Sequence, residues 1–167
     1  SGFLSSLRRP LFVWSEFSCP STLQLAEFIQ KLLEPVKSNQ IFLERIELGL
    51  HEALVNAVKH GNFNNSSKCL RVRRIVTPNW YIWQIQDEGN GTPENLRQGN
   101  LPRNIDANSG RGLYMICECF DDIRWSSKGN RVQLASRKSK NLVPRTARIF
   151  YFILYPAQGL LKLICCI

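Results

Sequence analysis

The longest regular pattern in the chain is helical. Apolar residues recur at three- and four-residue steps through residues 43–58, which predicts a helix with one buried face. This helix is expected to begin near Ile41 and to end at Gly61, because glycine often terminates helices. A shorter helix with the same spacing is predicted to follow a polar cap at Ser21 or Thr22 and to end near Leu33.

Five other segments are rich in branched and aromatic residues and read as strands. They are residues 11–17, 69–77, 81–86, 123–126 and 132–137, and a third helix is expected at residues 110–120. The first strand is expected to end at Cys19-Pro20, and Arg74-Ile75 interrupts the alternation of the second, which leaves a bulge or a strand end open there. The order of elements predicts an α+β fold, a two-layer sandwich with helices on one face of a mixed, mostly antiparallel sheet.

Composition and charge narrow the class of protein. With 167 residues, 44% of them hydrophobic and 21% charged, the chain is expected to form one domain with a full core. The net charge of +9 favours acidic partners and polyphosphates without singling out DNA. The six cysteines show neither C-x-x-C nor zinc-finger spacing, and no secretory leader is recognisable, so we interpret them as reduced core residues of a cytoplasmic protein.

Polar residues form a second regular pattern along the predicted long helix. Glu52, Asn56 and His60 are four residues apart, so each lies about 6 Å further along the axis and on nearly the same side, with Lys59 beside them. A carboxylate, an amide and an imidazole on one stripe suit a binding site. The alternative is an ordinary solvated helix edge.

Two glycine-containing segments favour the binding site. In Asp87-Glu88-Gly89-Asn90-Gly91 an acid ends an apolar strand before two glycines, and in 108–113 two glycines open an apolar helix. Either segment alone could be a simple turn, but their order along the chain is informative. Between them, residues 92–107 form a long polar loop of the kind that often carries function.

Three motifs together resemble the N, G1 and G2 boxes of GHKL (Bergerat-fold) ATP-binding domains. They are E-A-L-V-N-A-V-K-H-G, D-E-G-N-G and S-G-R-G-L, in that order along the chain. Within that superfamily the chain is most similar to bacterial anti-sigma factors that are also serine protein kinases. Their boxes read E-A-x-x-N-A-x-x-H and G-x-G-[LF]. The resemblance covers residues 11–138 and implies a GHKL ATP-binding kinase domain there, followed by a C-terminal extension at residues 139–167.

The resemblance implies a role for each box. Asn56 would be the sole protein ligand of Mg²⁺, which prefers oxygen ligands and keeps most of its waters, and Glu52 would be the catalytic base. Asp87 would accept the amino hydrogen of adenine, and Gly89 and Gly91 would leave room for the purine. The expected cofactor-binding residues are Asn56, Lys59, His60, Asp87, Gly89, Gly91, Ser109, Gly110, Arg111, Gly112 and Leu113.

The chain departs from the family pattern in two places. Asn130 follows Gly129 where the family has a threonine, so a hydroxyl contact to the nucleotide is missing. The extension at 139–167 carries apolar runs at 149–155 and 160–167. Four interpretations of it stay open: an element docked on the sheet or on a dimer mate, a partner-binding element, a membrane-surface anchor, or sequence unrelated to the native protein.

The expected function is an anti-sigma factor that binds ATP and Mg²⁺ and phosphorylates a serine of an anti-anti-sigma protein. Its partners would be a sigma factor, that antagonist and a second copy in a homodimer, with no direct contact to nucleic acid. One alternative is a non-catalytic nucleotide switch that sequesters a partner. The other is a basic module that binds nucleic acid or a membrane.

Overall fold

Five antiparallel strands form one sheet in the computed structural model, which describes residues 12–98 and 111–138. The strand order is β1-β2-β3-β5-β4, and every pairing between these strands is antiparallel. The strands are β1 (Val13–Pro20), β2 (Cys69–Val76), β3 (Trp80–Gln86), β4 (Asp122–Trp125) and β5 (Arg131–Arg137).

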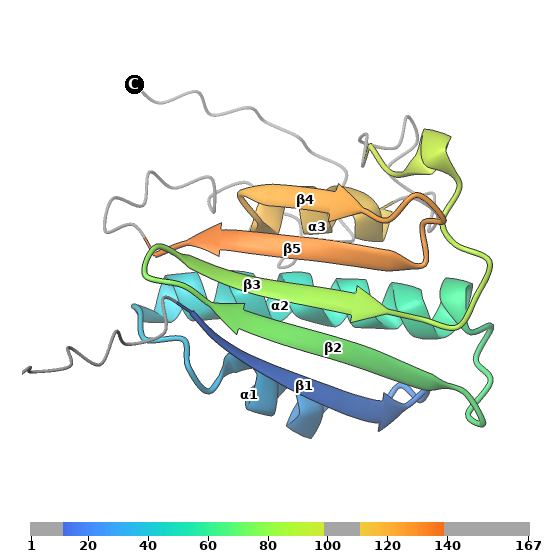
Figure 1. Cartoon of the computed structure of the whole chain (residues 1–167), viewed down its shortest axis with the longest axis horizontal. Coiled ribbons are helices and arrows are strands. Elements are labelled where there is room, and N and C mark those ends of the chain that lie inside the picture. Colours follow the sequence, from blue (N-terminus) through green and yellow to red (C-terminus); the bar gives the residue numbers. More distant parts are fainter. Residues whose placement is uncertain (1–11, 99–110, 139–167) are drawn as a thin grey trace, which may run out of the picture.

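Three α-helices pack on one face of the sheet (Figure 1). They are α1 (Ala26–Leu33), α2 (Gln40–Asn56) and α3 (Arg111–Cys119). A π-helical turn, η1 (Ala57–Gly61), directly follows α2, and a 3-10 turn, η2 (Glu94–Leu96), lies between β3 and α3. The predicted α+β sandwich and the predicted order of elements are therefore confirmed. No helix in the described ranges is long and apolar enough to cross a membrane.

The core lies between the helices and the sheet. Aromatic rings of Phe42, Tyr81, Trp83 and Phe120 contact one another in series, with centroids 6.1 to 6.2 Å apart. Trp83 is completely buried, and its indole N–H donates to the carbonyl of Leu32 at 3.1 Å, so its polar atom is satisfied. This contact fixes the end of α1 on the middle strand.

The first strand and the first helix differ from the sequence prediction. β1 continues through Cys19 to Pro20. The expected break fails because β1 is an edge strand, where the missing proline N–H costs little. The first helix begins at Ala26, and neither predicted residue caps it: the N-cap is Leu25, which makes no side-chain cap hydrogen bond.

The irregular alternation in β2 has a packing cause. The strand stays paired through Arg74 and Ile75, so neither a bulge nor a strand end occurs there. Arg74 extends toward the helices: its guanidinium lies 4.8 Å from the Phe17 ring centroid and donates to the carbonyl of Lys31 at 2.6 Å. Partial burial lowers the pKa of this guanidinium.

Four cysteines lie in the described ranges, and all are free thiols. Cys119 is buried, and desolvation raises its pKa to about 12. Cys69 is exposed at the start of β2, so the expectation of core cysteines is wrong for that residue.

Candidate functional site

The long helix widens where the first motif lies. α2 ends at Asn56, and the next five residues form a π-helical turn closed by a hydrogen bond of 2.8 Å from the Asn62 N–H to the Ala57 carbonyl. The sequence predicted an α-helix to Gly61, so the type of the last turn is a correction. Single π turns occur frequently at functional sites. Here the turn carries Gly61 to the loop that follows β3.

The start of α3 lies against the polar stripe of α2. A side-chain carbon built on Gly112 would lie 3.1 Å from Glu52 Oε2 and 3.2 Å from Asn56 Oδ1. The missing side chain therefore lets the first turn of α3 approach both groups. Since helix N-termini carry partial positive charge, this corner combines an anion-attracting backbone with a carboxylate and an amide.

Asp87 directly follows β3, at the end of the sheet to which the π turn leads. Its Oδ1 accepts the Gly89 N–H at 2.7 Å, and its backbone N–H donates to the Asn130 carbonyl at 3.0 Å. Burial raises the pKa of this carboxyl, while the Gly89 hydrogen bond and the charges of Lys128 and Lys68 partly oppose the rise. A half-buried carboxylate with a fixed position can accept a hydrogen bond from a ligand.

The glycines around Asp87 allow backbone segments to meet. A side-chain carbon on Gly61 would overlap the Asp87 carboxyl, and one on Gly89 would overlap the Gly61 carbonyl. Gly91 has a φ of +94° and lies against the carbonyl of Lys128. These close approaches give a structural reason for glycine at positions 89 and 91, and the expectation that they also leave room for a purine stays a prediction.

Asn62 joins three segments at this end of the sheet, and the sequence analysis did not single it out. The side chain is fully buried. Its Oδ1 accepts the Glu88 N–H at 2.8 Å, and its Nδ2 donates to the Cys69 carbonyl at 3.2 Å. Asn62 thus holds the loop after β3 against the helix end and the start of β2. A polar residue directly after the terminal glycine was the only available signal.

Arg97 and Asn130 also support the site without having been predicted to do so. The Arg97 guanidinium donates to the carbonyls of Thr92, Ser126 and Ser127 at 2.8, 3.3 and 3.3 Å, which ties the loop after β3 to the β4–β5 turn. The Asn130 side chain donates to the Asp87 carbonyl at 3.3 Å. Because the contacts to Ser126, Ser127 and Asp87 are non-local, the sequence gives no pattern for them.

His51 is a fourth residue near the site that the sequence patterns did not indicate. Its Nδ1 lies 3.8 Å from Glu52 Oε1, and both side chains are partly exposed. When the imidazole is protonated the two form an ion pair. His51 therefore lies beside the carboxylate of Glu52.

The predicted site residues fall into three groups. Glu52, Asn56 and Gly112 meet at one corner, and Asp87 and Gly89 meet the π turn about 7 Å further along the helix axis. Lys59 and His60 are exposed, Leu113 packs partly against the core and Arg111 is half-buried. Ser109 and Gly110 lie outside the described residues.

The donor set can be tested against a metal. In residues 12–98 and 111–138, no group of three or more His, Cys, Asp or Glu side chains could hold a metal ion. The amide oxygen of Asn56 beside a helix N-terminus suits a different arrangement, in which the ligand's own phosphates supply most of the oxygens around Mg²⁺. The residues therefore fit a metal-nucleotide complex better than a free cation.

A larger hollow than the one at the sheet face lies away from the motif residues. A groove of about 800 Å³ runs between α1 and α2, and Glu27, Glu44, Glu47 and His51 are among its lining residues. None of the predicted site residues lines this groove, so volume alone does not identify the motif corner.

Comparison with known proteins agrees with the motif geometry. A family model described as histidine kinase-like ATPase domain matches residues 20–136, a range that contains all three motifs. A search of curated proteins finds no match.

Proposed function

The chain belongs to the family of histidine kinase-like ATPase domains, and from that premise we propose that it is an anti-sigma factor with serine protein kinase activity. Membership makes ATP the nucleotide. The finer assignment is supported by the sequence pattern E-A-x-x-N-A-x-x-H at residues 52–60 and G-x-G-L at residues 110–113, which resembles the anti-sigma kinases.

The proposed substrate is a serine hydroxyl on a small anti-anti-sigma protein. The second proposed partner is an RNA polymerase sigma factor, held by a homodimer of this chain in the cytoplasm. In this scheme, phosphorylation of the antagonist keeps it from displacing the sigma factor.

One observation carries the proposal: the first turn of α3 lies beside both Glu52 and Asn56. A side-chain carbon on Gly112 would lie within 3.2 Å of each of them. A helix N-terminus attracts phosphate oxygens, an amide oxygen suits Mg²⁺, and a carboxylate can accept a proton. Phosphoryl transfer relies on positioned phosphates and on a proton acceptor beside the nucleophile, and these three groups can supply both.

Each chain residue then has a stated role in the transfer. ATP, when bound, supplies the γ-phosphoryl group. Glu52 would accept the proton of the attacking serine hydroxyl. The serine oxygen would then form the bond to the γ-phosphorus while the bond from that phosphorus to the leaving ADP oxygen breaks. Asn56 would hold Mg²⁺ through its amide oxygen, and the N-terminus of α3 would hold phosphate oxygens.

Asp87 supplies base recognition in this scheme. Its carboxylate is half-buried and fixed by the Gly89 N–H, so it can accept the exocyclic amino hydrogen of adenine. Guanine presents a carbonyl oxygen at the corresponding position, which a carboxylate repels. Loss of such a hydrogen bond to a charged acceptor costs about 1.5–3 kcal/mol.

The test is incubation with γ-labelled ATP, Mg²⁺ and a candidate antagonist protein, alongside Glu52→Gln. We expect labelled antagonist with the wild-type chain, and ATP binding without transfer in the variant. Glu44→Gln on the same helix is the matched control, because Glu44 is exposed and accepts its hydrogen bond from Gln40, away from the motif corner. Transfer that survives in Glu52→Gln contradicts the assigned base, and wild-type ATP binding without any transfer favours a nucleotide switch instead.

A further inference from the structure

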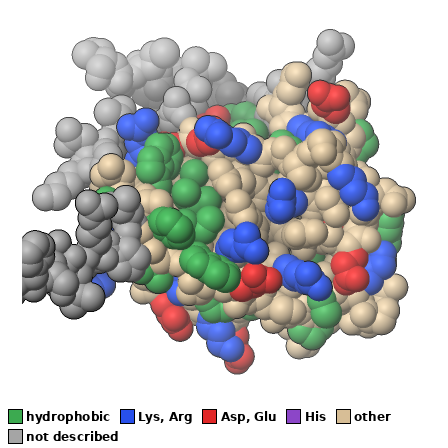
Figure 2. All heavy atoms as spheres, viewed as in Figure 1, with side chains coloured by type: hydrophobic (Ala, Val, Ile, Leu, Met, Phe, Trp, Pro, Cys, Tyr) green, Lys and Arg blue, Asp and Glu red, His purple; other side chains and the backbone are tan. Residues whose placement is uncertain are grey.

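The sheet face opposite the helices is divided into a basic half and an apolar half. Within the described part of the chain no helix covers this face, which points toward the viewer in Figure 1. Figure 2 shows the same face: hydrophobic side chains gather at one end, and Lys and Arg side chains are spread over the remainder.

The basic half follows the strand register. Arg71 on β2 and Arg131 on β5 flank Gln86 on β3 in one cross-strand row, and Arg73 pairs with Gln84 in the next row. Since neighbouring strands are about 4.8 Å apart, Arg71 and Arg131 lie about 10 Å apart across Gln86. A small hollow of about 90 Å³ lies among Glu16, Arg71, Arg73, Gln84, Gln86 and Arg131.

Only part of this positive charge is neutralised by the chain. Arg73 pairs with Glu16 at 3.3 Å and Arg124 pairs with Asp122 at 2.8 Å. Arg71 and Arg131 have no ion-pair partner among the described residues.

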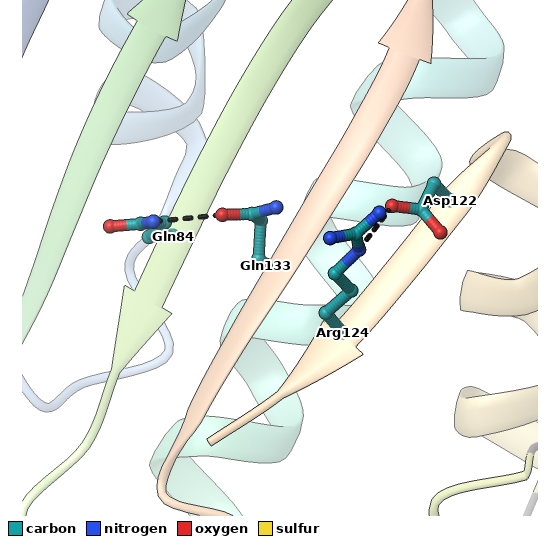
Figure 3. A network of polar contacts seen from close by, with 4 residues as sticks. All are labelled: Gln84, Asp122, Arg124 and Gln133. Carbon is teal, nitrogen blue, oxygen red and sulfur yellow. Dashed lines mark hydrogen bonds and ion pairs between the residues drawn. The ribbon is translucent and has the colours of Figure 1, made fainter.

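Polar side chains beside these arginines are held in place by contacts with one another. In Figure 3 the Gln84 amide points toward Gln133 on the neighbouring strand, donating to it at 2.8 Å, while Arg124 turns to Asp122 along β4. Side chains fixed across three strands form a flat surface that loses little conformational entropy when a ligand binds.

The apolar half lies in the adjoining row. Trp14, Ile75 and Ile82 are direct cross-strand neighbours, and Trp14 is 56% exposed. The Arg73 guanidinium lies 5.4 Å from the Trp14 ring centroid, and the Arg137 guanidinium lies 4.8 Å from that of Trp80. An exposed apolar row bordered by cations is typical of an interaction surface.

We propose that this face docks an acidic, amphipathic segment of a partner protein. Its carboxylates would pair with Arg71 and Arg131, and its apolar side chains would cover Trp14, Ile75 and Ile82. Charge complementarity defines the class of partner, because the unneutralised groups on the face are guanidinium groups.

The chain's own ends do not have this chemistry. Residues 1–11 contain Arg8 and Arg9, and residues 139–167 contain Lys140, Arg145, Arg148 and Lys162, with no Asp or Glu in either segment. Both would place further positive charge beside the arginines.

Single-stranded nucleic acid is also a poorer fit than an acidic protein segment. Bases bind by stacking on aromatic rings. The centre of the apolar half is aliphatic, at Ile75 and Ile82, and a guanidinium already lies over Trp14 and over Trp80. Aliphatic side chains instead suit leucine or phenylalanine side chains of a peptide.

The proposal does not rest on nucleotide binding, because the motif residues lie on the helix side and this face lies on the other. The test measures binding of a fluorescent synthetic peptide with glutamates on one helical face and leucines on the other. The same peptide with lysine replacing glutamate, an oligothymidylate and an unlabelled peptide of residues 139–155 serve as competitors. ATP binding is measured on the same samples as a separate test of the proposed function, and a sample that binds ATP is also shown to be folded.

We expect the acidic peptide to bind the full chain and the Arg71→Glu/Arg131→Glu variant to bind it at least tenfold more weakly. Lys31→Glu/Lys37→Glu is the matched control, since both lysines are exposed on the helix side and the charge change is equal. Trp14→Ala should also weaken binding without reversing any charge.

Four results would overturn the proposal. They are equal loss in the control variant, stronger competition by oligothymidylate, displacement by the 139–155 peptide, and a change in sedimentation of the peptide-free chain on Arg71→Glu/Arg131→Glu. The last would assign the face to a second copy of the chain. Absence of any peptide binding would refute it as well, whatever ATP does.

Discussion

Replacement of Asn62 tests how the candidate site is held together. In Asn62→Leu the two side-chain hydrogen bonds, at 2.8 Å to the Glu88 N–H and at 3.2 Å to the Cys69 carbonyl, are both lost. Leucine has a similar size, so the main cost is two backbone groups left without partners. Each such group costs about 1–3 kcal/mol when buried, and these two are only part-buried. We therefore expect a loss of about 2–4 kcal/mol in the free energy of unfolding.

Urea denaturation followed by tryptophan fluorescence measures this loss directly. At about 3 °C per kcal/mol for a chain of this size, the melting temperature should fall by roughly 6–12 °C. Asn95→Leu is the control, because Asn95 is exposed in η2, and it should stay within about 0.5 kcal/mol of the wild type. An Asn62→Leu protein as stable as the control would show that Asn62 does not hold the loop beside Asp87.

Three further predictions concern the same site. Asp87→Asn should weaken ATP binding yet raise the free energy of unfolding at pH 7. The pKa of Asp87 is raised above 3.8 in the folded state, so the folded carboxyl binds its proton more tightly than the unfolded one, and stability is lost as pH rises through that range. Denaturation at pH 3 and pH 7 checks this, and a variant less stable than the wild type at pH 7 would contradict it. Gly89→Ala should destabilise the fold by about 2 kcal/mol or more, because the new methyl group meets the Gly61 backbone. In Gly112→Ala the methyl group meets only the ends of side chains, so this variant should keep its stability but bind ATP more weakly. Equal melting curves for the two variants would refute the distinction. Arg97→Ala should expose the loop after β3 to limited proteolysis, since three carbonyl contacts are lost, and an unchanged cleavage rate would show that this clamp is dispensable.

Patterns of local sequence were sufficient for most of the fold. Helical spacing located α2, and richness in branched and aromatic residues located β2 and β3 to within a residue at each end. The start of α1 was misplaced by several residues because Ser21 looked like a cap, whereas its N–H is bonded to the Lys68 carbonyl beyond the end of β1. That contact depends on the tertiary fold and has no local signature.

The candidate site was predictable only in part, for a related reason. Glu52, Asn56 and Gly112 could be placed together from motif order, and the structure brings them together. Asn62, Arg97 and Asn130 could not, because their roles depend on contacts with backbone groups that are distant in sequence, such as those of Arg97 with Ser126 and Ser127. The π turn was also invisible, since residues 57–61 carry the same apolar spacing as an α-helix.

Titration of the isotopically labelled chain with ATP and Mg²⁺, followed through the backbone amide signals of Gly89 and Gly112, probes the two ends of the cradle in one experiment. Both signals are expected to shift and to saturate at the same nucleotide concentration, because adenine would lie beside Asp87 while the phosphates lie at the start of α3. Shifts confined to one glycine, or two signals that saturate at different concentrations, would mean that the two motif clusters do not bind a single nucleotide.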